Sequence, residues 1–234
     1  MKIHVGTSGY GYKEWKGKFY PGTISPKEML RFYSERLDAV EINNTFYHMP
    51  TESVLRSWAQ QVPVGFVFAL KAPQGITHRK RLKNVEEEMA YLFRTLMVLE
   101  EKLGPLLFQF PENFRMDLQV LKSFFTLIPG QVSCAFEFRG PLPPGGEIPD
   151  LLRERGYSLC IADTDEKPAG GIVSTAPRGY LRLRRSDYTD ADLRQWLESI
   201  RSQPWKRAFV FFKHEEEAKG PKTAIRFREL ISSG

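Results

Sequence analysis

The chain has 234 residues, of which 41% are hydrophobic, 13% aromatic and 26% charged. This length suits one domain and this composition suits a chain with a sizeable packed core, so general disorder and fibrous structure are excluded. The 34 lysines and arginines outnumber the 28 acidic residues, a surplus that is compatible with phosphate-rich partners but identifies none.

Short apolar runs alternate with longer segments of helical period, a rhythm typical of parallel α/β folds. Strands are expected at residues 3–6, 39–43, 66–71, 106–110, 132–138, 158–163, 180–184 and 208–213. Helices are expected at residues 26–37, 52–61, 85–103, 118–127, 148–155, 191–201 and 222–231. Ser25, followed by Pro26 and Glu28, predicts a capped start for the first helix.

The alternation is interrupted between the sixth and seventh strands. Prolines and glycines within residues 164–179 indicate a loop in place of a helix, and residues 141–146 are expected to form a shorter loop. Eight strands with helical crossovers predict an α/β fold, a single (β/α)8 barrel of the TIM type over residues 1–234. An open doubly wound sheet is the alternative, because the pattern alone does not prove closure.

The cellular compartment is predicted from the cysteines and from hydropathy. Cys134 and Cys160 are the only cysteines, too few for a disulfide framework or a cysteine-based zinc site, so a reducing compartment is expected. The N-terminal run has no signal-peptide pattern, and no apolar stretch approaches the length of a bilayer span. We therefore expect a cytoplasmic protein with no membrane partner.

Side chains alternate between the two faces of a strand, so parity separates residues facing the helices from residues facing the barrel axis. The bulky apolar set is expected to meet the helices. The polar residues expected on the axis, with Asp163 at the end of the sixth strand, are Glu41, Asn43, Lys71, Gln109, Glu137, Arg139, Arg182 and Arg184. Most of them lie near the C-terminal ends of strands, where barrel enzymes have their active sites. Their positive surplus suits an anionic ligand.

Motifs spread over the chain resemble one protein family. They are Gly-Thr-Ser-Gly-Tyr at 6–10 with Trp15, Val-Glu-Ile-Asn-Asn-Thr-Phe-Tyr at 40–47, Lys-Ala-Pro at 71–73, Ile-Thr-His at 76–78, Leu-Leu-Phe-Gln-Phe-Pro at 106–111, Glu-Phe-Arg at 137–139 and Ala-Asp at 162–163. In this order they resemble the domain-of-unknown-function 72 family, also called YecE-like. The resemblance implies a TIM-type barrel and no established activity. The similar architecture of sugar isomerases and abasic-site endonucleases is a fold-level analogy.

Two segments depart from the family pattern. After the seventh strand the family usually has Arg-x-His-Gly, where residues 182–185 read Arg-Leu-Arg-Arg. After the eighth strand an Asn-Asn pair is usual, where this chain has Lys213 and His214 followed by three glutamates. Both segments lie at the rim of the predicted site, so ligand specificity is not carried over from them.

A metal site is one chemistry that the residues allow. Glu41, Glu137 and Asp163 could hold Mg2+ or Mn2+ through oxygen, with His78 or His214 assisting. The four histidines show no zinc-ligand spacing, which disfavours a multi-zinc site.

Metal-free chemistry is a second alternative. Glu41 or Glu137 could accept a proton, and Lys71 or His78 could donate one. Lys71 could also form a Schiff base with a carbonyl substrate. An ion pair between Lys71 and Glu137 would oppose both roles of the lysine by keeping its amine charged.

Nucleic-acid binding or processing is a third alternative. Residues 78–83 read His-Arg-Lys-Arg-Leu-Lys, and Tyr10, Trp15 and Tyr47 could stack on bases. The three glutamates at 215–217 would repel phosphate. No nucleotide cofactor is expected, because neither a P-loop nor a dinucleotide-binding motif occurs.

The leading hypothesis is a hydrolase or lyase acting at the C-terminal mouth on a phosphate-bearing substrate, either a small anion or a nucleic acid. The catalytic candidates are Glu41, Lys71, His78, Glu137 and Asp163. The substrate-binding candidates are Tyr10, Trp15, Asn43, Tyr47, Gln109, Arg139 and Arg182. The alternatives are a non-catalytic sugar- or nucleotide-binding module and a plug of charges that only fixes strand register. The metal requirement and the oligomeric state are left open.

Overall fold

Eight parallel strands form a closed barrel in the order in which they occur in the chain. They are β1 (Lys2–Ser8), β2 (Ala39–Ile42), β3 (Val67–Lys71), β4 (Leu103–Phe110), β5 (Cys134–Phe138), β6 (Ser158–Asp163), β7 (Arg178–Leu183) and β8 (Arg207–Phe212). The structure is a computed structural model that describes residues 1–140 and 146–233, so the predicted loop at 141–146 lies almost wholly outside it. Because β1 pairs with both β2 and β8, the barrel prediction is confirmed and the open sheet is excluded.

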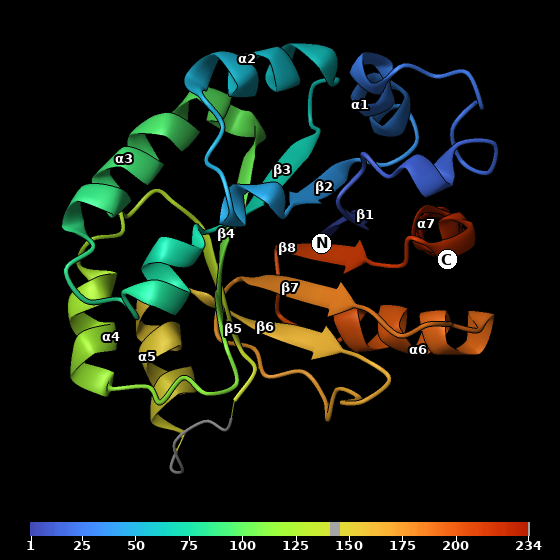
Figure 1. Ribbon diagram of the computed structural model, residues 1–234. Helices are drawn as coiled ribbons and strands as arrows, with labels where there is room; N and C mark the ends of the chain where they lie inside the picture. Colours follow the sequence, from blue (N-terminus) through green and yellow to red (C-terminus); the bar gives the residue numbers. More distant parts are fainter. Residues whose placement is uncertain (141–145, 234) are drawn as a thin grey trace.

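The helices lie outside the strands, as Figure 1 shows. They are α1 (Pro26–Ser34), α2 (Glu52–Gln61), α3 (Glu86–Leu96), α4 (Leu118–Phe125), α5 (Glu147–Arg155), α6 (Asp190–Arg201) and α7 (Lys219–Ser232). Shorter helical turns are η1 (Lys13–Trp15), η2 (Asn44–Phe46), η3 (Gly75–Arg79), η4 (Met97–Lys102) and η5 (Glu216–Ala218). At the start of α1, the Glu28 carboxylate accepts hydrogen bonds from the backbone and hydroxyl of Ser25, which confirms the predicted cap.

The connection between β6 and β7 contains no helix or strand. The prediction of a loop in place of a helix is therefore confirmed. One wall of the barrel consequently lacks the usual covering helix, and α6 and α7 lie beside β7 and β8 (Figure 1).

The helix predicted at 85–103 is too long. α3 ends at Leu96, a 3-10 segment follows, and Glu100 has a φ of 52°. The chain reverses there and enters β4 early, where Gly104 lies against β3. A Cβ on Gly104 would meet the Val67 side chain at 2.4 Å, so the close contact between the strands requires glycine.

Apolar residues fill the barrel toward the N-terminal ends of its strands. They include alanines on β2, β3 and β5 and larger residues on the other strands: Ala39, Val67, Ala69, Leu107, Ala135, Cys160, Tyr180, Phe209 and Phe211. On five strands a polar residue follows two positions later, which places it on the same face and nearer the C-terminal mouth. The apolar layer thus forms the floor of a polar site.

None of the described helices combines the length and apolarity that crossing a membrane requires.

Candidate functional site

A buried arginine on β7 joins two buried carboxylates at the centre of the barrel. Arg182 donates from Nη2 to Glu41 Oε1 at 2.8 Å, and from Nη1 to Glu137 Oε2. All three side chains are at most 6% exposed. A buried charge without a partner would be strongly destabilising, and this pairing gives each of the three charges a partner. The predicted convergence of Glu41, Glu137 and Arg182 is present in the structure.

Glu41 is saturated with hydrogen bonds. Besides Arg182, it accepts from the Ser8 hydroxyl at 2.8 Å, the Tyr180 hydroxyl at 2.7 Å and the Asn43 amide at 3.1 Å. Burial and the Glu41 charge raise the pKa of Tyr180 well above its usual value. With every oxygen engaged and no exposed surface, Glu41 is suited to fixing neighbouring strands and poorly placed to touch a substrate.

Glu137 lies closer to the mouth. Its Oε1 accepts from Gln109 Nε2 at 2.8 Å and lies 3.4 Å from Arg139 Nε. Burial opposes ionisation, but the charges of Arg182 and Arg139 outweigh it and lower the pKa of Glu137 below the usual value. The side chain is therefore an anion at neutral pH.

Lys71 is separated from this ion network by an amide. Its Nζ donates to Gln109 Oε1 at 2.6 Å and lies 3.8 Å from the centre of the Phe46 ring. Among the described residues no carboxylate lies within ion-pairing distance of it, so the ion pair between Lys71 and Glu137 that would have kept the amine charged is not formed. Burial and the Arg182 charge lower the pKa of Lys71 to about 8. A substantial fraction of the amine is neutral slightly above physiological pH.

His78 contacts the same aromatic ring as Lys71. It follows β3 on the π-helical turn η3, and its ring meets Phe46 edge-on at 4.8 Å between centroids. Its Nδ1 is 2.8 Å from the Thr77 hydroxyl. Burial and the Lys71 charge lower the pKa of His78, so the imidazole is mostly neutral at pH 7 and can accept a proton.

A cavity of about 510 Å³ opens beside Glu137 at the C-terminal ends of β5, β6 and β7. Its lining consists of Glu112, Glu137, Phe138, Arg139, Cys160, Ala162, Thr164, Glu166, Lys167 and Arg184. The Arg184 side chain is 15% exposed, and its Nη2 lies 3.6 Å from Glu41 Oε1. Its Nε is buried and has no hydrogen-bond partner among the described residues.

Cations exceed carboxylates around the axis. In the described part of the chain, the cations there are Lys71, Arg139, Arg182 and Arg184, and the carboxylates are Glu41 and Glu137. At the rim, Lys167 pairs with Glu112 at 3.2 Å and Glu166 also lines the cavity. The predicted excess of positive charge on the axis is present, and Asp163 is not among the carboxylates that reduce it.

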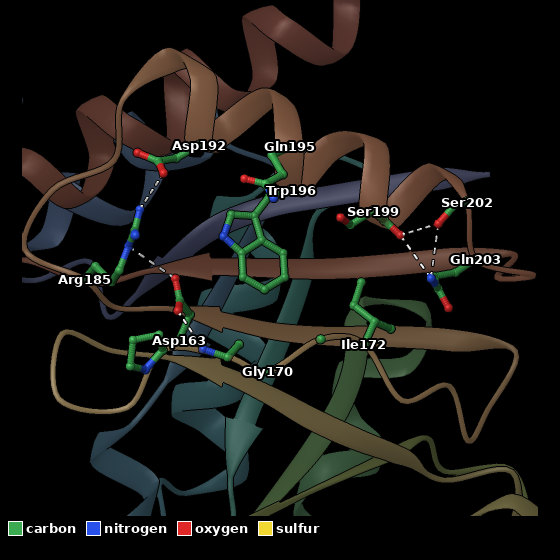
Figure 2. A pocket seen from close by; sticks show the side chains of 13 residues that line it. Asp163, Gly170, Ile172, Arg185, Asp192, Gln195, Trp196, Ser199, Ser202 and Gln203 are labelled. Atoms are coloured by element: carbon green, nitrogen blue, oxygen red, sulfur yellow. Dashed lines mark hydrogen bonds and ion pairs between the residues drawn. The ribbon is translucent and has the colours of Figure 1, made fainter.

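The prediction that Asp163 joins the site on the axis is wrong. In β6 it pairs with Leu183 of β7, whereas Ala162 pairs with the inward-facing Arg182, so its parity directs it away from the axis. Figure 2 shows it in a separate pocket between the β6–β7 loop and α6, beside Arg185. Its oxygens accept from Ala169 N at 2.9 Å and from the Tyr188 hydroxyl at 2.8 Å. Position at a strand end suggested a place in the site that strand parity rules out.

The predicted metal ligands are consequently not brought together. Among the described residues no group of three His, Cys, Asp or Glu side chains is arranged to hold a metal ion. Asp163 lies outside the axis, and His214 directs Nε2 to the Arg184 carbonyl oxygen at 3.0 Å.

The predicted aromatic contacts are only partly available. Trp15 is a second correction: it has no exposed surface, and its indole donates to the Glu215 carbonyl, because η1 packs it under η5. Tyr10 and Asn43 line a different cavity of about 320 Å³ near α1 and α2. Tyr47 is 65% exposed and packs edge-on against Phe46.

Ser8 and Tyr180 are site residues that the sequence reasoning missed. Both bond to Glu41. Tyr180 lies two residues before Arg182 on the same strand face, so parity could have identified it. Lys167 and Thr164 reach the cavity from the β6–β7 loop, for which periodicity gives no signal.

The chain is similar to known proteins over its whole length. Residues 4–234 match the family described as "Protein of unknown function DUF72". UPF0759 protein YunF of Bacillus subtilis is 29% identical over 92% of this chain and 79% of its own length. UPF0759 protein YecE of Escherichia coli is 26% identical over 78% of this chain and 66% of its own length.

Solved structures share the fold. A DUF72 family protein from Thermotoga maritima superimposes with a TM-score of 0.86 at 24% identity, covering 99% of this chain and 100% of that one. A DUF72 family protein from Enterococcus faecalis gives 0.78 at 19% identity, covering 99% and 96%. At this identity the likeness concerns the fold alone. The family match over nearly all residues, which agrees with the resemblance of the motifs, is decisive: the chain belongs to the DUF72 family of proteins of unknown function.

Proposed function

We propose that the protein is a lyase or hydrolase that binds a small phosphate-bearing substrate in the cavity at the C-terminal mouth of the barrel. The observation that carries the proposal is Arg184, whose buried Nε has no partner among the described residues and whose side chain lines the cavity. A charged donor left unpaired in a buried position is costly. Phosphate oxygens are acceptors that match a guanidinium group well.

The neighbouring charges support an anionic ligand. Arg139 lines the same cavity and is 48% exposed, so it can contact a ligand while Glu137 orients its Nε. A bound dianion would offset the excess of cations over carboxylates on the axis. Such an arrangement of fixed positive groups also stabilises negative charge that develops during bond cleavage.

Lys71 and His78 are the proposed proton-transfer groups. Burial and neighbouring cations lower both pKa values. The pKa of Lys71 thereby comes closer to the range that acid–base catalysis uses, and His78 is kept in its neutral, proton-accepting form. Glu137 would hold Arg139 and Arg182 in place rather than move a proton, because its own pKa is lowered. Glu41 would act only through Arg182.

Phosphate binding can be tested by thermal unfolding in increasing inorganic phosphate and in a panel of sugar phosphates. A ligand at about one hundred times its Kd stabilises the folded state by about 2.7 kcal/mol. The rise in Tm should be lost in Arg184→Gln and retained in Lys122→Gln, which removes an exposed charge on α4. An equal rise in both variants would contradict binding at the mouth.

A non-catalytic sugar- or nucleotide-binding module is the alternative. The variant Lys71→Met distinguishes the two. If the protein is an enzyme, this variant should still bind phosphate but should no longer turn over the substrate found in the panel. Unchanged turnover in this variant would remove Lys71 from the reaction.

Single-stranded nucleic acid is a second candidate substrate. It is favoured by the exposed Arg79, Lys80, Arg81 and Lys83 after β3 and by the exposed Tyr47, since basic loops and aromatic rings bind single strands together. A fluorescence-anisotropy titration over a salt series tests it: several phosphate contacts make affinity fall steeply with salt. No binding near physiological salt would exclude nucleic acid.

We also propose a cytoplasmic location. Cys134 and Cys160 are both free and buried, as suits a reducing compartment. Fractionation of cells expressing a tagged chain would test it.

A further inference from the structure

We propose that Lys71 attacks the carbonyl carbon of a phosphorylated aldehyde or ketone and forms an imine. The inference rests on the proposed function, because it assigns the substrate class of the same site. Three features of the lysine carry it: its hydrogen-bond partner, its surroundings and the anion-binding groups next to it.

The hydrogen-bond partner of Lys71 does not require a charged amine. Nζ donates to the amide oxygen of Gln109, whose own amide nitrogen is committed to Glu137. The orientation of the Gln109 amide is therefore fixed from the other side. A neutral amine can still donate this bond, although more weakly than an ammonium, whereas a carboxylate at the same place would favour the ammonium far more.

The surroundings of Lys71 favour the nucleophilic form. The side chain is half-buried, Nζ lies over the Phe46 ring, and Arg182 and Arg139 are the neighbouring cations. A desolvated lysine close to other cations is the arrangement that activates an amine for attack on a carbonyl. The contact with the Phe46 ring holds the amine in one place. A ring face by itself favours the ammonium, so burial and the neighbouring cations are what favour the neutral form.

The phosphate-binding groups lie on the other side of the same hydrogen-bond chain. Gln109 and Glu137 connect Lys71 to the cavity that Arg139 and Arg184 line. A substrate whose phosphate binds Arg139 and Arg184 would extend past Glu137 toward Lys71. The inferred ligand therefore carries a phosphate at one end and a carbonyl toward the other.

The step balances without an oxidant or a cofactor. The Nζ lone pair forms a bond to the carbonyl carbon, and the carbonyl oxygen takes one proton from the nitrogen to give a carbinolamine. The carbon–oxygen bond then breaks, and the oxygen leaves as water with the second nitrogen proton. The imine then takes a proton from solvent, with neutral His78 accepting and returning protons. The protonated imine can accept electrons from a neighbouring bond of the substrate.

The test is reductive trapping on the whole wild-type protein. Glyceraldehyde 3-phosphate is added at mildly alkaline pH, sodium borohydride reduces any imine to a stable secondary amine, and peptide mass mapping locates the adduct. Lys213, which directly follows β8 at the same mouth and is 45% exposed, is the internal control. We expect Lys71 to be modified about tenfold faster than Lys213, because burial and neighbouring cations lower the pKa of Lys71 to about 8.

Two further measurements locate the cause of the labelling. Inorganic phosphate should slow the modification of Lys71 but not that of Lys213, and unphosphorylated glyceraldehyde should label Lys71 less. Labelling of Lys71 no faster than that of Lys213 would overturn the inference. Lys71→Met, examined for residual labelling at neighbouring lysines, checks that the mapped site is correct.

The failure of this inference is distinguishable from the failure of the proposed function. Phosphate-dependent stabilisation that is sensitive to Arg184→Gln, without faster labelling of Lys71, overturns the imine and leaves the phosphate site. Fast labelling without any phosphate effect overturns the phosphorylated substrate and the proposed function together.

Discussion

Lys71 and Glu137 both reach the barrel axis, from β3 and β5, yet they are held apart by the amide of Gln109 on the strand between them. The amide oxygen accepts from the lysine, and the amide nitrogen donates to the glutamate. Gln109 thereby denies the lysine a carboxylate partner, so that burial and the Arg182 charge lower the pKa of the amine unopposed by an ion pair.

Replacing Gln109 by glutamate should reverse this effect. A carboxylate at 109 would pair with Lys71 and raise its pKa toward the usual value, so the rate of imine trapping near neutral pH should fall by about tenfold or more. The measurement is the pH profile of Lys71 labelling, which should move to higher pH in Gln109→Glu. Gln119→Glu adds the same charge on exposed α4 and should leave the profile in place. An unmoved profile in Gln109→Glu would show that the amide does not set the amine's pKa.

Arg182→Met should destabilise the fold strongly. It leaves Glu41 and Glu137 buried without their common cation, and breaking a buried pair in this way costs about 3–5 kcal/mol. Chemical denaturation measures the loss, and Arg226→Met is the control, because its pairs with Asp190 and Glu229 are exposed and exposed pairs contribute little to stability. A loss no larger than the control's would show that the buried network is dispensable.

The deficit of Arg182→Met should shrink in acid. In the wild type the pKa of Glu137 is lowered, so its stabilising contribution is present above the unfolded pKa and is lost as pH falls through the folded one. In the variant the same carboxyl is buried without Arg182, its pKa rises, and protonation relieves the unpaired charge. Denaturation curves of both proteins are measured at neutral pH and near pH 4. The difference in unfolding free energy between wild type and variant should be smaller at the lower pH. A deficit that grows on acidification would contradict this account.

Asp163→Asn tests the corrected position of Asp163. The carboxylate anchors the β6–β7 loop through Ala169 N and binds the Tyr188 hydroxyl, so losing its charge should cost about 1–3 kcal/mol of stability. Phosphate binding at the mouth should be unchanged, as measured by the same thermal titration. If the variant folds stably but no longer binds phosphate, Asp163 contributes to the site after all.

Gly6→Ala tests how closely β1 and β2 approach. A Cβ on Gly6 would lie 1.9 Å from the Ala39 carbonyl oxygen, a contact that backbone movement must relieve at a cost of about 1–3 kcal/mol. Gly22→Ala is the matched control, because nothing lies within 4 Å of a Cβ there. The two variants should differ clearly in Tm, and equal values would mean that the strands separate easily.

The strands and most axis residues could be predicted from sequence because alternation is a local property. Parity alone was enough to bring Glu41, Glu137 and Arg182 to one axis. The prediction for Asp163 failed because it rested on the residue's place at the strand end and not on parity. The parity of Asp163 is that of Ile161, which is packed in the outer core.

The finer geometry of the site depends on contacts between distant segments. Neither spacing nor parity indicates that an amide lies between Lys71 and Glu137, since this depends on the register of three strands. The burial of Trp15 follows from its packing against η5, about two hundred residues later in the chain. The cavity takes part of its lining from the β6–β7 loop, whose path no periodic pattern describes.

Closure of the barrel has a consequence for synthesis. Lys2 pairs with Arg207 and Thr7 with Phe212, so the first strand of the barrel to be synthesised has to wait for the eighth before its second edge is covered. Until then β1 presents unpaired backbone groups that another chain could bind. Contacts between such distant residues also make folding slow. The need to shield the β1 edge during translation is thus built into the same strand pairing that holds the mature barrel together.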